Sequence, residues 1–271
     1  MALPAPSPDA SVLVTGSSSG IGEQIARRLA DLGHGVTLVA RRAERLEELA
    51  AELHRATGVT ARVEACDLAD DSARWSLIAR LSEADAHISG VVNSAGFGSY
   101  GRFDGLPLDR EQAMVRLNVL ALHELTGAFL WPMVERGAGA ILNVASVAAF
   151  QPLPGFATYA ATKSFVQTFS ESLHAELTGT GVSVTTLSPG PVPTEFGIVA
   201  GVGSAEEPAA AGMAVSAQDV AAAAVRGMLH GKRTVVPGVA TKGMALGGRF
   251  VPRSLLLPAA KRAAGARLRN P

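Results

Sequence analysis

Short runs of apolar, mostly β-branched residues alternate along the chain with longer stretches in which apolar residues recur at helical spacing. A run of four to eight such residues bounded by turn residues predicts a strand, and apolar residues at every third or fourth position predict a helix. Strands are expected over residues 11–15, 36–40, 59–66, 88–93, 140–145, 182–187 and 234–236. Helices are expected over residues 21–32, 44–55, 70–84, 110–134 (closed near Pro132), 159–177 and 217–229.

Strands that alternate with helices indicate βαβ units, in which helices cover both faces of a parallel sheet. Because such crossovers are right-handed, the pattern predicts an α/β, doubly wound fold. No linker or internal repeat divides it, so one domain is expected over residues 11–240. The Pro-rich residues 1–10 predict a flexible N-terminal tail, and the Gly/Ala-rich residues 197–212 predict a mobile loop.

Residues 241–271 form a C-terminal extension that allows two interpretations. Three leucines (255–257) precede several basic residues, and such a composition is typical of an interfacial basic helix. The interpretation that we favour is a segment that covers a pocket or contacts a neighbouring subunit and then ends in a frayed tail. The basic residues are Lys261, Arg262, Arg267 and Arg269.

Composition narrows the function classes. The chain has 271 residues, of which 48% are hydrophobic, and its formal net charge is zero. This balance gives no support to nucleic-acid binding, which favours a clustered basic surface. The single cysteine excludes an internal disulfide, and no Cys/His cluster indicates a metal site. Neither a signal peptide nor a run of 18 apolar residues is evident, so a cytoplasmic protein without a membrane span is expected.

The first strand runs into the Gly-rich segment TGSSSGIG, residues 15–22. Glycines permit a tight turn and close approach of the backbone to a pyrophosphate, and the next helix points its N-terminus at that anion. The spacing differs from the commoner G-x-G-x-x-G, and an ordinary Gly-rich turn is the alternative. The candidate cofactor residues in this segment are Gly16, Ser18, Ser19, Gly20, Ile21 and Gly22.

The second strand ends at Ala40-Arg41-Arg42, with no acidic residue before Glu44. An acidic residue at this place binds the ribose 2′-hydroxyl of NAD and repels a 2′-phosphate, whereas guanidinium groups bind phosphate in bidentate fashion. The sequence therefore favours NADP(H) over NAD(H), which stays possible, and Arg41 takes the place of the expected acid. The alternative is that both arginines are a solvated helix start.

Two further strand ends carry candidate cofactor residues. Asp67, followed by Leu68 after the third strand, could accept a hydrogen bond from an adenine amino group, or could cap the following helix. The fourth strand ends in Asn93-Ser94-Ala95-Gly96. Small residues there, Ala95 and Gly96 with Asn93, would let a cofactor pass over the strand ends, although a simple turn would have the same composition.

Tyr159 and Lys163 stand four residues apart on an expected helix, so both project from one side of it. A free phenol titrates near pH 10 and is a poor base at neutral pH. A nearby ammonium would lower the pKa of Tyr159 and bring it toward the range useful for acid–base catalysis. Such pairs are also common on solvated helices, so the pair needs support from elsewhere.

Ser146 gives that support, because it directly follows the fifth strand, and ligands bind at the carboxyl ends of strands in doubly wound sheets. A hydroxyl there can donate to a substrate carbonyl oxygen. A nucleophilic serine of a hydrolase is the rival interpretation, but no G-x-S-x-G elbow surrounds it. Asn118, in the middle of a helix, could hold a water that links Lys163 to solvent, or could be a satisfied core amide.

Taken together and in this order, the residues resemble the short-chain dehydrogenase/reductase family with a Tyr-x-x-x-Lys active site. The resemblance covers about residues 11–195, and Ser94 departs from it where the family most often has a second Asn. The matched residues are Thr15–Gly22, Asp67, Asn93–Gly96, Asn118, Ser146, Tyr159 with Lys163, and Pro189-Gly190 followed by Thr194.

The resemblance implies a Rossmann-type sheet of about seven strands and a carbonyl/alcohol oxidoreductase that transfers a hydride from NAD(P)H. It implies that Tyr159 is the acid/base, that Ser146 orients the substrate, that Lys163 also binds the nicotinamide ribose, and that Asn118 holds a relay water. It implies a homodimer or homotetramer formed through long helices. Pro189, Gly190, Val192 and Thr194 would border the nicotinamide.

The substrate is expected to be a small-molecule carbonyl or alcohol of lipophilic character. Loop segments 148–154 and 191–215 should border it, and Phe150 and Phe196 are the candidate substrate-binding residues beside Ser146 and Tyr159. Their apolar character could equally be plain packing. An alternative function is a cofactor-binding regulator or scaffold of the same fold, which would be expected to lack part of the catalytic set.

Overall fold

The computed structural model describes residues 2–84, 86–202 and 214–265. Seven parallel strands form one sheet in the order β3-β2-β1-β4-β5-β6-β7, which confirms the doubly wound Rossmann-type prediction. The strands are β1 Ala10–Thr15, β2 Gly35–Ala40, β3 Ala61–Ala65, β4 His87–Asn93, β5 Gly139–Val144, β6 Val182–Leu187 and β7 Thr234–Val235.

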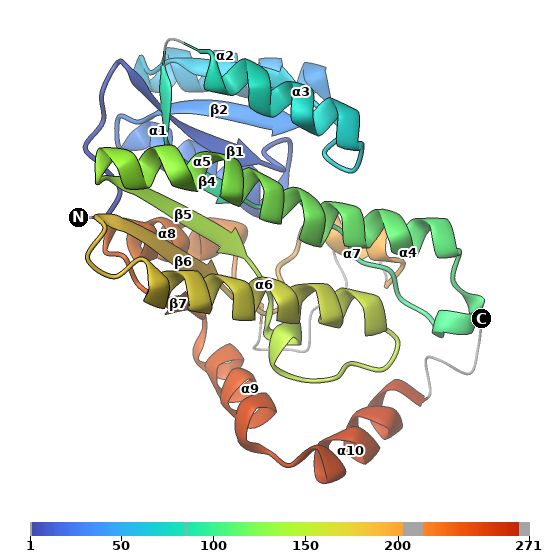
Figure 1. Cartoon of the computed structure of the whole chain (residues 1–271). Coiled ribbons are helices and arrows are strands. Elements are labelled where there is room, and N and C mark those ends of the chain that lie inside the picture. Colours follow the sequence, from blue (N-terminus) through green and yellow to red (C-terminus); the bar gives the residue numbers. More distant parts are fainter. Residues whose placement is uncertain (1, 85, 203–213, 266–271) are drawn as a thin grey trace.

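Helices cover both faces of this sheet, and Figure 1 shows α4, α5 and α6 in front of it and α1 and α8 behind it. Alternate strand residues therefore enter different cores: Val12 and Val14 of β1 join one cluster, and Leu13 joins the other. Burial on both faces explains why the strands are almost wholly apolar. The helices expected from the pattern are α1 Gly20–Asp31, α2 Ala43–Thr57, α3 Asp71–Ser82, α4 Leu108–Val115, α5 Leu122–Arg136, α6 Ala157–Glu176 and α8 Ala217–Leu229.

Helices α4 and α5 are joined by a π-helical turn, Arg116–Ala121, into one continuous helix. The prediction that this helix closes near Pro132 is wrong, because it continues to Arg136 and ends at Gly137, whose φ of 65° is left-handed. By length and mean hydropathy (1.2) this helix is the one in the described chain that could cross a membrane. Its inner side instead packs in the domain core through Leu125, Phe129 and Met133.

The sequence pattern missed several short elements. They include two helices, α7 Phe196–Ala200 and α9 Val239–Phe250, and two 3-10 turns, Phe103–Gly105 and Val147–Phe150. Helix α10, Arg253–Gly265, lies in the segment for which a basic helix was one of the two interpretations. The prediction of a flexible N-terminal tail also needs correction. Leu3 is only 1% exposed within the core, and the Ala2 N–H donates to the Leu229 carbonyl at 2.9 Å, because the Pro-rich segment places an apolar side chain against α8. Residues 203–212 of the expected mobile loop lie outside the described residues.

Strand order places the candidate site. The chain leaves β1 toward one edge of the sheet and leaves β4 toward the other, so the loops after these two neighbouring strands diverge. Ligands bind at such switch points, beyond the carboxyl ends of the strands. The Gly-rich turn follows β1, residues 94–96 follow β4, Ser146 follows β5 and Pro189 follows β6, so the predicted residues meet at one end of the sheet.

Candidate active site

The Gly-rich turn after β1 is built around the absence of side chains. Gly16 has a φ of +67°, and a Cβ there would lie 2.8 Å from the Ala95 Cα. A Cβ on Gly22 would lie 2.4 Å from the Gly16 carbonyl oxygen. The Thr15 hydroxyl accepts from the N–H groups of Ser94 and Ala95, at 3.0 and 3.1 Å, and so joins the turn to the end of β4.

Helix α1 begins at Gly20 directly behind this turn. Its N-cap residue, Ser19, makes no side-chain capping hydrogen bond, so the first N–H groups stay available to an anion. Positive helix dipole and free N–H groups together suit a pyrophosphate. Thr194 lies against the same turn, because a Cβ on Gly20 would be 3.2 Å from its Cγ2 atom. The structure thus brings Thr194 to the Gly-rich turn, whereas its expected place beside the nicotinamide stays a prediction.

The two arginines after β2 differ in their surroundings. Arg42 donates from Nη2 to Glu195 Oε2 at 2.9 Å and to Ser18 Oγ at 3.1 Å, so its guanidinium links the Gly-rich turn to the segment after β6. This ion pair holds the pKa of the Glu195 carboxyl below its usual range. Arg41 is exposed and makes no ion pair with any described residue. Glu195 is a site neighbour that the sequence reasoning missed.

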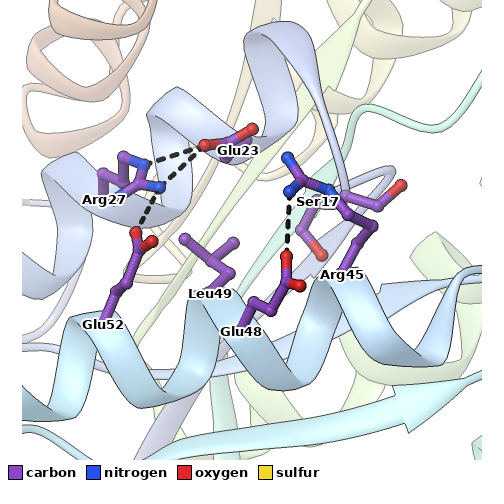
Figure 2. A pocket seen from close by; sticks show the side chains of 8 residues that line it. Ser17, Glu23, Arg27, Arg45, Glu48, Leu49 and Glu52 are labelled. Atoms are coloured by element: carbon purple, nitrogen blue, oxygen red, sulfur yellow. Dashed lines mark hydrogen bonds and ion pairs between the residues drawn. The ribbon is translucent and has the colours of Figure 1, made fainter.

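A pocket beside the Gly-rich turn lies between α1 and α2, and Figure 2 shows the charged side chains that line it. Arg27 pairs with Glu23 and Glu52, and Arg45 pairs with Glu48 at 2.9 Å. Both arginines are thus matched by carboxylates. Of the four arginines described here around the turn (Arg27, Arg41, Arg42 and Arg45), Arg41 is the one without a carboxylate partner among the described residues.

Asp67 and Leu68 lie at the end of β3. The Asp67 Oδ1 atom accepts from the Ala69 N–H at 3.0 Å, and the side chain that caps α3 is Asp70, not Asp67. The helix-cap alternative for Asp67 is therefore wrong, and its exposed carboxylate keeps acceptor capacity for a ligand. The Leu68 side chain is buried in the core, and its carbonyl accepts from Arg74 Nη1 at 2.6 Å.

Asn93 turns its side chain away from the strand ends. The amide nitrogen donates to Asn143 Oδ1 at 2.9 Å and to Thr126 Oγ1 at 3.1 Å, inside a buried network that Asn143 extends to Ser170. The Oδ1 atom of Asn93 is buried with no hydrogen-bond partner. As a cofactor residue, Asn93 therefore offers backbone only, and its side chain joins β4, β5 and α5.

The first turn of α6 carries Tyr159 and, one turn later, Lys163. Lys163 is buried, and its ammonium donates to the Val144 carbonyl at the end of β5 at 2.8 Å. The Nζ atom lies 5.8 Å from the centroid of the Tyr159 ring. The predicted pair is thus brought together at the strand ends, with its cation fixed by backbone.

The ionisation of this pair departs from the prediction. Burial raises the pKa of Tyr159 to about 12, although a hydrogen bond with Ser146 opposes the rise, and burial lowers the pKa of Lys163 to about 8. The expected net fall of the Tyr159 pKa is therefore wrong for the protein alone. For Tyr159, loss of solvation outweighs the stabilisation of the phenolate by the hydrogen bond with Ser146.

Ser146 begins the 3-10 turn Val147–Phe150. Its hydroxyl accepts from the Ala148 N–H at 3.1 Å and also bonds to Tyr159. The turn is anchored to the next strand end, because the Val147 N–H donates to the Pro189 carbonyl at 3.0 Å. Among the described residues no histidine bonds to Ser146, so nothing here activates it as a nucleophile.

Asn118 lies within the π-helical turn, a feature often found at functional sites. Its Oδ1 accepts from the Phe97 N–H at 3.1 Å, and its Nδ2 donates to the Phe97 carbonyl and to Thr162 Oγ1. The amide is thus a satisfied core group that fixes the loop after β4. It also stands beside Gly96, where a Cβ would lie 2.9 Å from Asn118 Oδ1 and 3.5 Å from Lys163 Nζ.

Aromatic rings surround Tyr159. Its ring centroid lies 5.2 Å from that of Phe196 and 5.9 Å from that of Phe156, and Tyr100 packs on Phe156 at 4.9 Å. The sequence had predicted Phe196 here but missed Tyr100, for which its pattern offered no signal. Gly98 permits the approach, because a Cβ there would lie 2.8 Å from the Phe196 ring.

The remaining predicted residues border this group. Phe150 packs against Gly248 of α9, where a Cβ would be 3.0 Å from the Phe150 carbonyl oxygen. Gly190 faces α9 as well, since a Cβ there would be 2.7 Å from Thr241 Oγ1. Val192 packs partly into the core beside α1 and α8. Helix α9 therefore closes the side of the site that lies beyond β6.

Comparison with known proteins gives consistent results. A profile described as short chain dehydrogenase matches residues 10–201. A sulfoacetaldehyde reductase 2 of Chromohalobacter salexigens is 42% identical over 190 residues, which are 69% of this chain and 75% of that protein.

Solved structures agree in fold over nearly the whole chain. A short-chain dehydrogenase from Sphingobium yanoikuyae in complex with NADPH superposes with a TM-score of 0.80 at 33% identity, covering 92% of this chain and 95% of that one. A bulky-bulky ketone specific alcohol dehydrogenase from Comamonas testosteroni has a TM-score of 0.76 at 28% identity, covering 97% and 96% of the two chains.

Proposed function

The chain belongs to the short-chain dehydrogenase family, and from that premise we propose that it is an NADP(H)-dependent carbonyl reductase acting on lipophilic ketones or aldehydes and the corresponding alcohols. The observation that carries the proposal is the meeting of Ser146, Tyr159 and Lys163 at the strand ends, beside a turn whose close contacts only glycine allows. Such a turn fits a dinucleotide, because its backbone can approach a pyrophosphate closely.

In this proposal the bound nicotinamide supplies the hydride to the carbonyl carbon. Tyr159 donates its proton to the carbonyl oxygen, and Ser146 orients that oxygen by a hydrogen bond. The raised pKa of Tyr159, about 12, keeps the phenol protonated at neutral pH and therefore ready to act as an acid in reduction. Lys163, fixed by the Val144 carbonyl, would hold the nicotinamide ribose.

Preference for NADP(H) rests on Arg41, whose exposed guanidinium follows β2 where an acidic residue would select NAD(H). Arg42 would contribute once the 2′-phosphate competes with Glu195 for it. The NADPH complex of the Sphingobium relative supports the same preference.

A lipophilic substrate is favoured by the aromatic rings of Phe156 and Phe196 that pack against Tyr159. A sulfonated aldehyde, as named for the Chromohalobacter relative, needs a cation near the carbonyl. Among the described residues, the cation beside the Tyr159 ring is Lys163, and its ammonium is already bound by a backbone carbonyl.

Initial rates of NADPH and NADH oxidation with a panel of carbonyl compounds test this proposal. We expect turnover with NADPH, and a kcat/KM for bulky apolar ketones about tenfold or more above that for a small sulfonated aldehyde. Preference for the sulfonated aldehyde would contradict the substrate class. Binding of NADPH without turnover of any carbonyl or alcohol would favour the regulator or scaffold alternative.

We also propose that the protein acts in the cytoplasm as a homodimer or homotetramer. Support for self-association comes from large apolar side chains on the outer sides of α5 and α6, where Trp131 is 67% exposed and Phe165 is 39% exposed. Mass measurement by light scattering tests the assembly, and Trp131→Ser should weaken it.

A further inference from the structure

Helix α9 carries apolar side chains on the side that faces away from the protein. Its inner side is buried through Thr241 and Ala245. The outer side presents Val239, Leu246 and Phe250, which are 88%, 58% and 75% exposed. Spacings of seven and four residues place these three in one stripe along the helix. The stripe is the reverse of what a helix at the surface of a water-soluble domain normally shows.

Helix α10 continues this apolar surface past the corner at Val251. Leu255 and Leu257 are 66% and 44% exposed, and Val251 itself is 41% exposed. Figure 1 shows the corner between α9 and α10 projecting away from the sheet. We call the exposed apolar residues of this corner the C-terminal apolar surface; they are Val239, Leu246, Phe250, Val251, Leu255 and Leu257.

The charged side chains on these two helices are all basic. The described residues 239–265 include five basic residues and no acidic one. Lys242 and Arg249 are exposed along α9, and Arg253 begins α10. Of these, Arg249 reaches Glu171 at 3.2 Å, whereas Lys242 and Arg253 form no ion pair with the described residues. The surface is therefore apolar with a basic margin.

A second copy of the chain is a poor occupant for this surface. Two-fold pairing brings the same residues together, so Lys242 and Arg253 would face helices that carry basic and no acidic side chains among residues 239–265. Like charges facing one another across an interface are unfavourable. An anionic lipid bilayer fits both the apolar side chains and the basic margin of this surface. It accepts apolar side chains below its headgroups and attracts Lys and Arg at its surface.

We propose that the C-terminal apolar surface is a peripheral membrane-docking surface that binds bilayers containing anionic lipid. Phe250, Val251 and Leu255 at the corner would enter the headgroup region, while Lys242 and Arg253 contact lipid phosphates. Because α9 packs on Phe150, docking would place the substrate side of the site next to the bilayer. This consequence rests on the proposed function, whereas membrane binding itself does not.

Co-sedimentation of the full-length protein with vesicles tests the proposal. We expect binding to vesicles of phosphatidylcholine mixed with an equal amount of phosphatidylglycerol, and much weaker binding to phosphatidylcholine alone. Phe250→Ser and Leu246→Ser should each weaken binding about tenfold, the loss expected when one large apolar contact disappears. Lys242→Gln and Arg253→Gln should each weaken it about fivefold and reduce its dependence on salt.

Trp75→Ser is the matched control, since Trp75 is a 54% exposed apolar residue on α3, far from the C-terminal helices in Figure 1. It should leave vesicle binding unchanged, and thermal melting should show that all variants fold. The proposal is overturned by absent binding, by equal binding to neutral vesicles, or by equal losses in the Trp75 variant. It is also overturned if Phe250→Ser converts a dimer to a monomer while vesicles bind neither form. Any of these results leaves NADPH turnover, and so the proposed function, untouched.

Discussion

The two halves of the site are built by opposite means. Around the Gly-rich turn, one short segment, residues 15–22, forms the cradle, and its shape depends on missing side chains, as the 2.4 Å approach of a Gly22 Cβ to the Gly16 carbonyl shows. Around Tyr159, the geometry depends on buried polar side chains that come from separate elements. The first half is a backbone surface for binding, and the second is a set of functional groups for chemistry.

This difference separates two kinds of damage. A change at Tyr159 or Ser146 should remove turnover and spare cofactor binding, because the cradle does not use those side chains. A change in the cradle should affect cofactor binding and folding together, because the same backbone contacts serve both.

The largest effect is expected from Tyr159→Phe, which removes the acid but keeps the ring that packs against Phe156 and Phe196. Turnover should fall by about 10³-fold, within the range usual for loss of a general acid. The Kd for NADPH, measured by its fluorescence, should stay nearly the same. If turnover persisted at the wild-type rate, another group would have to supply the proton.

Lys163 should impose a pH dependence on stability. Its pKa is about 8 in the folded protein against 10.5 normally, so between these pH values the unfolded chain binds more protons and stability rises with pH. In cofactor-free protein, urea unfolding should show wild type gaining about 3 kcal/mol over Lys163→Met across this window. Both proteins keep Tyr159, whose opposite effect above pH 10 therefore cancels. A parallel pH profile for the two proteins would rule out a buried, destabilised ammonium.

Gly22→Ala should damage the cradle. The new Cβ would overlap the Gly16 carbonyl, so the free energy of unfolding should fall by about 2 kcal/mol and NADPH should bind more weakly. Gly127→Ala is the matched control, since Gly127 is exposed in α5 and no atom lies within 4 Å of an added Cβ. This substitution should raise the free energy of unfolding by about 0.5–1 kcal/mol. Chemical denaturation and cofactor titration measure both, and a Gly22 variant with unchanged NADPH affinity would contradict a glycine-dependent cradle.

Arg41→Asp should have the smallest effect and should alter the choice of cofactor rather than turnover. Loss of one charge-assisted contact predicts a Kd for NADPH about tenfold weaker, with NADH little changed or improved. Arg55→Asp, at the far end of α2, controls for net charge. A wild-type protein that already prefers NADH would remove the basis of this prediction.

How much of the molecule was predictable depends on how local each feature is. The strands and main helices follow from periodicity, and the cradle follows from eight consecutive residues. The ion pair of Arg42 with Glu195 joins residues 153 positions apart, so no spacing pattern could indicate it. The direction of Asn93, into a network with Thr126 and Asn143, was hidden for the same reason.

Other features depend on solvation or on weak local signals. The pKa of Tyr159 depends on how completely the fold excludes water, which its neighbours in the sequence do not reveal. The Pro-rich N-terminal segment was predicted to be flexible, because the burial of Leu3 cannot be inferred without knowing where α8 lies. Helices α7 and α9 contain several glycines and alanines, which weaken the periodic spacing of large apolar residues on which helix prediction depends.

The Arg42–Glu195 pair has a consequence for how an anionic cofactor would arrive. If the proposed function is right, a cofactor phosphate that binds Arg42 must displace the Glu195 carboxylate from it. Binding at Arg42 therefore exchanges one anionic partner for another. Added salt weakens the contact that is lost and the contact that is gained alike. At this residue, ionic strength should therefore scarcely disturb nucleotide affinity, and the salt sensitivity that the 2′-phosphate adds should come from Arg41.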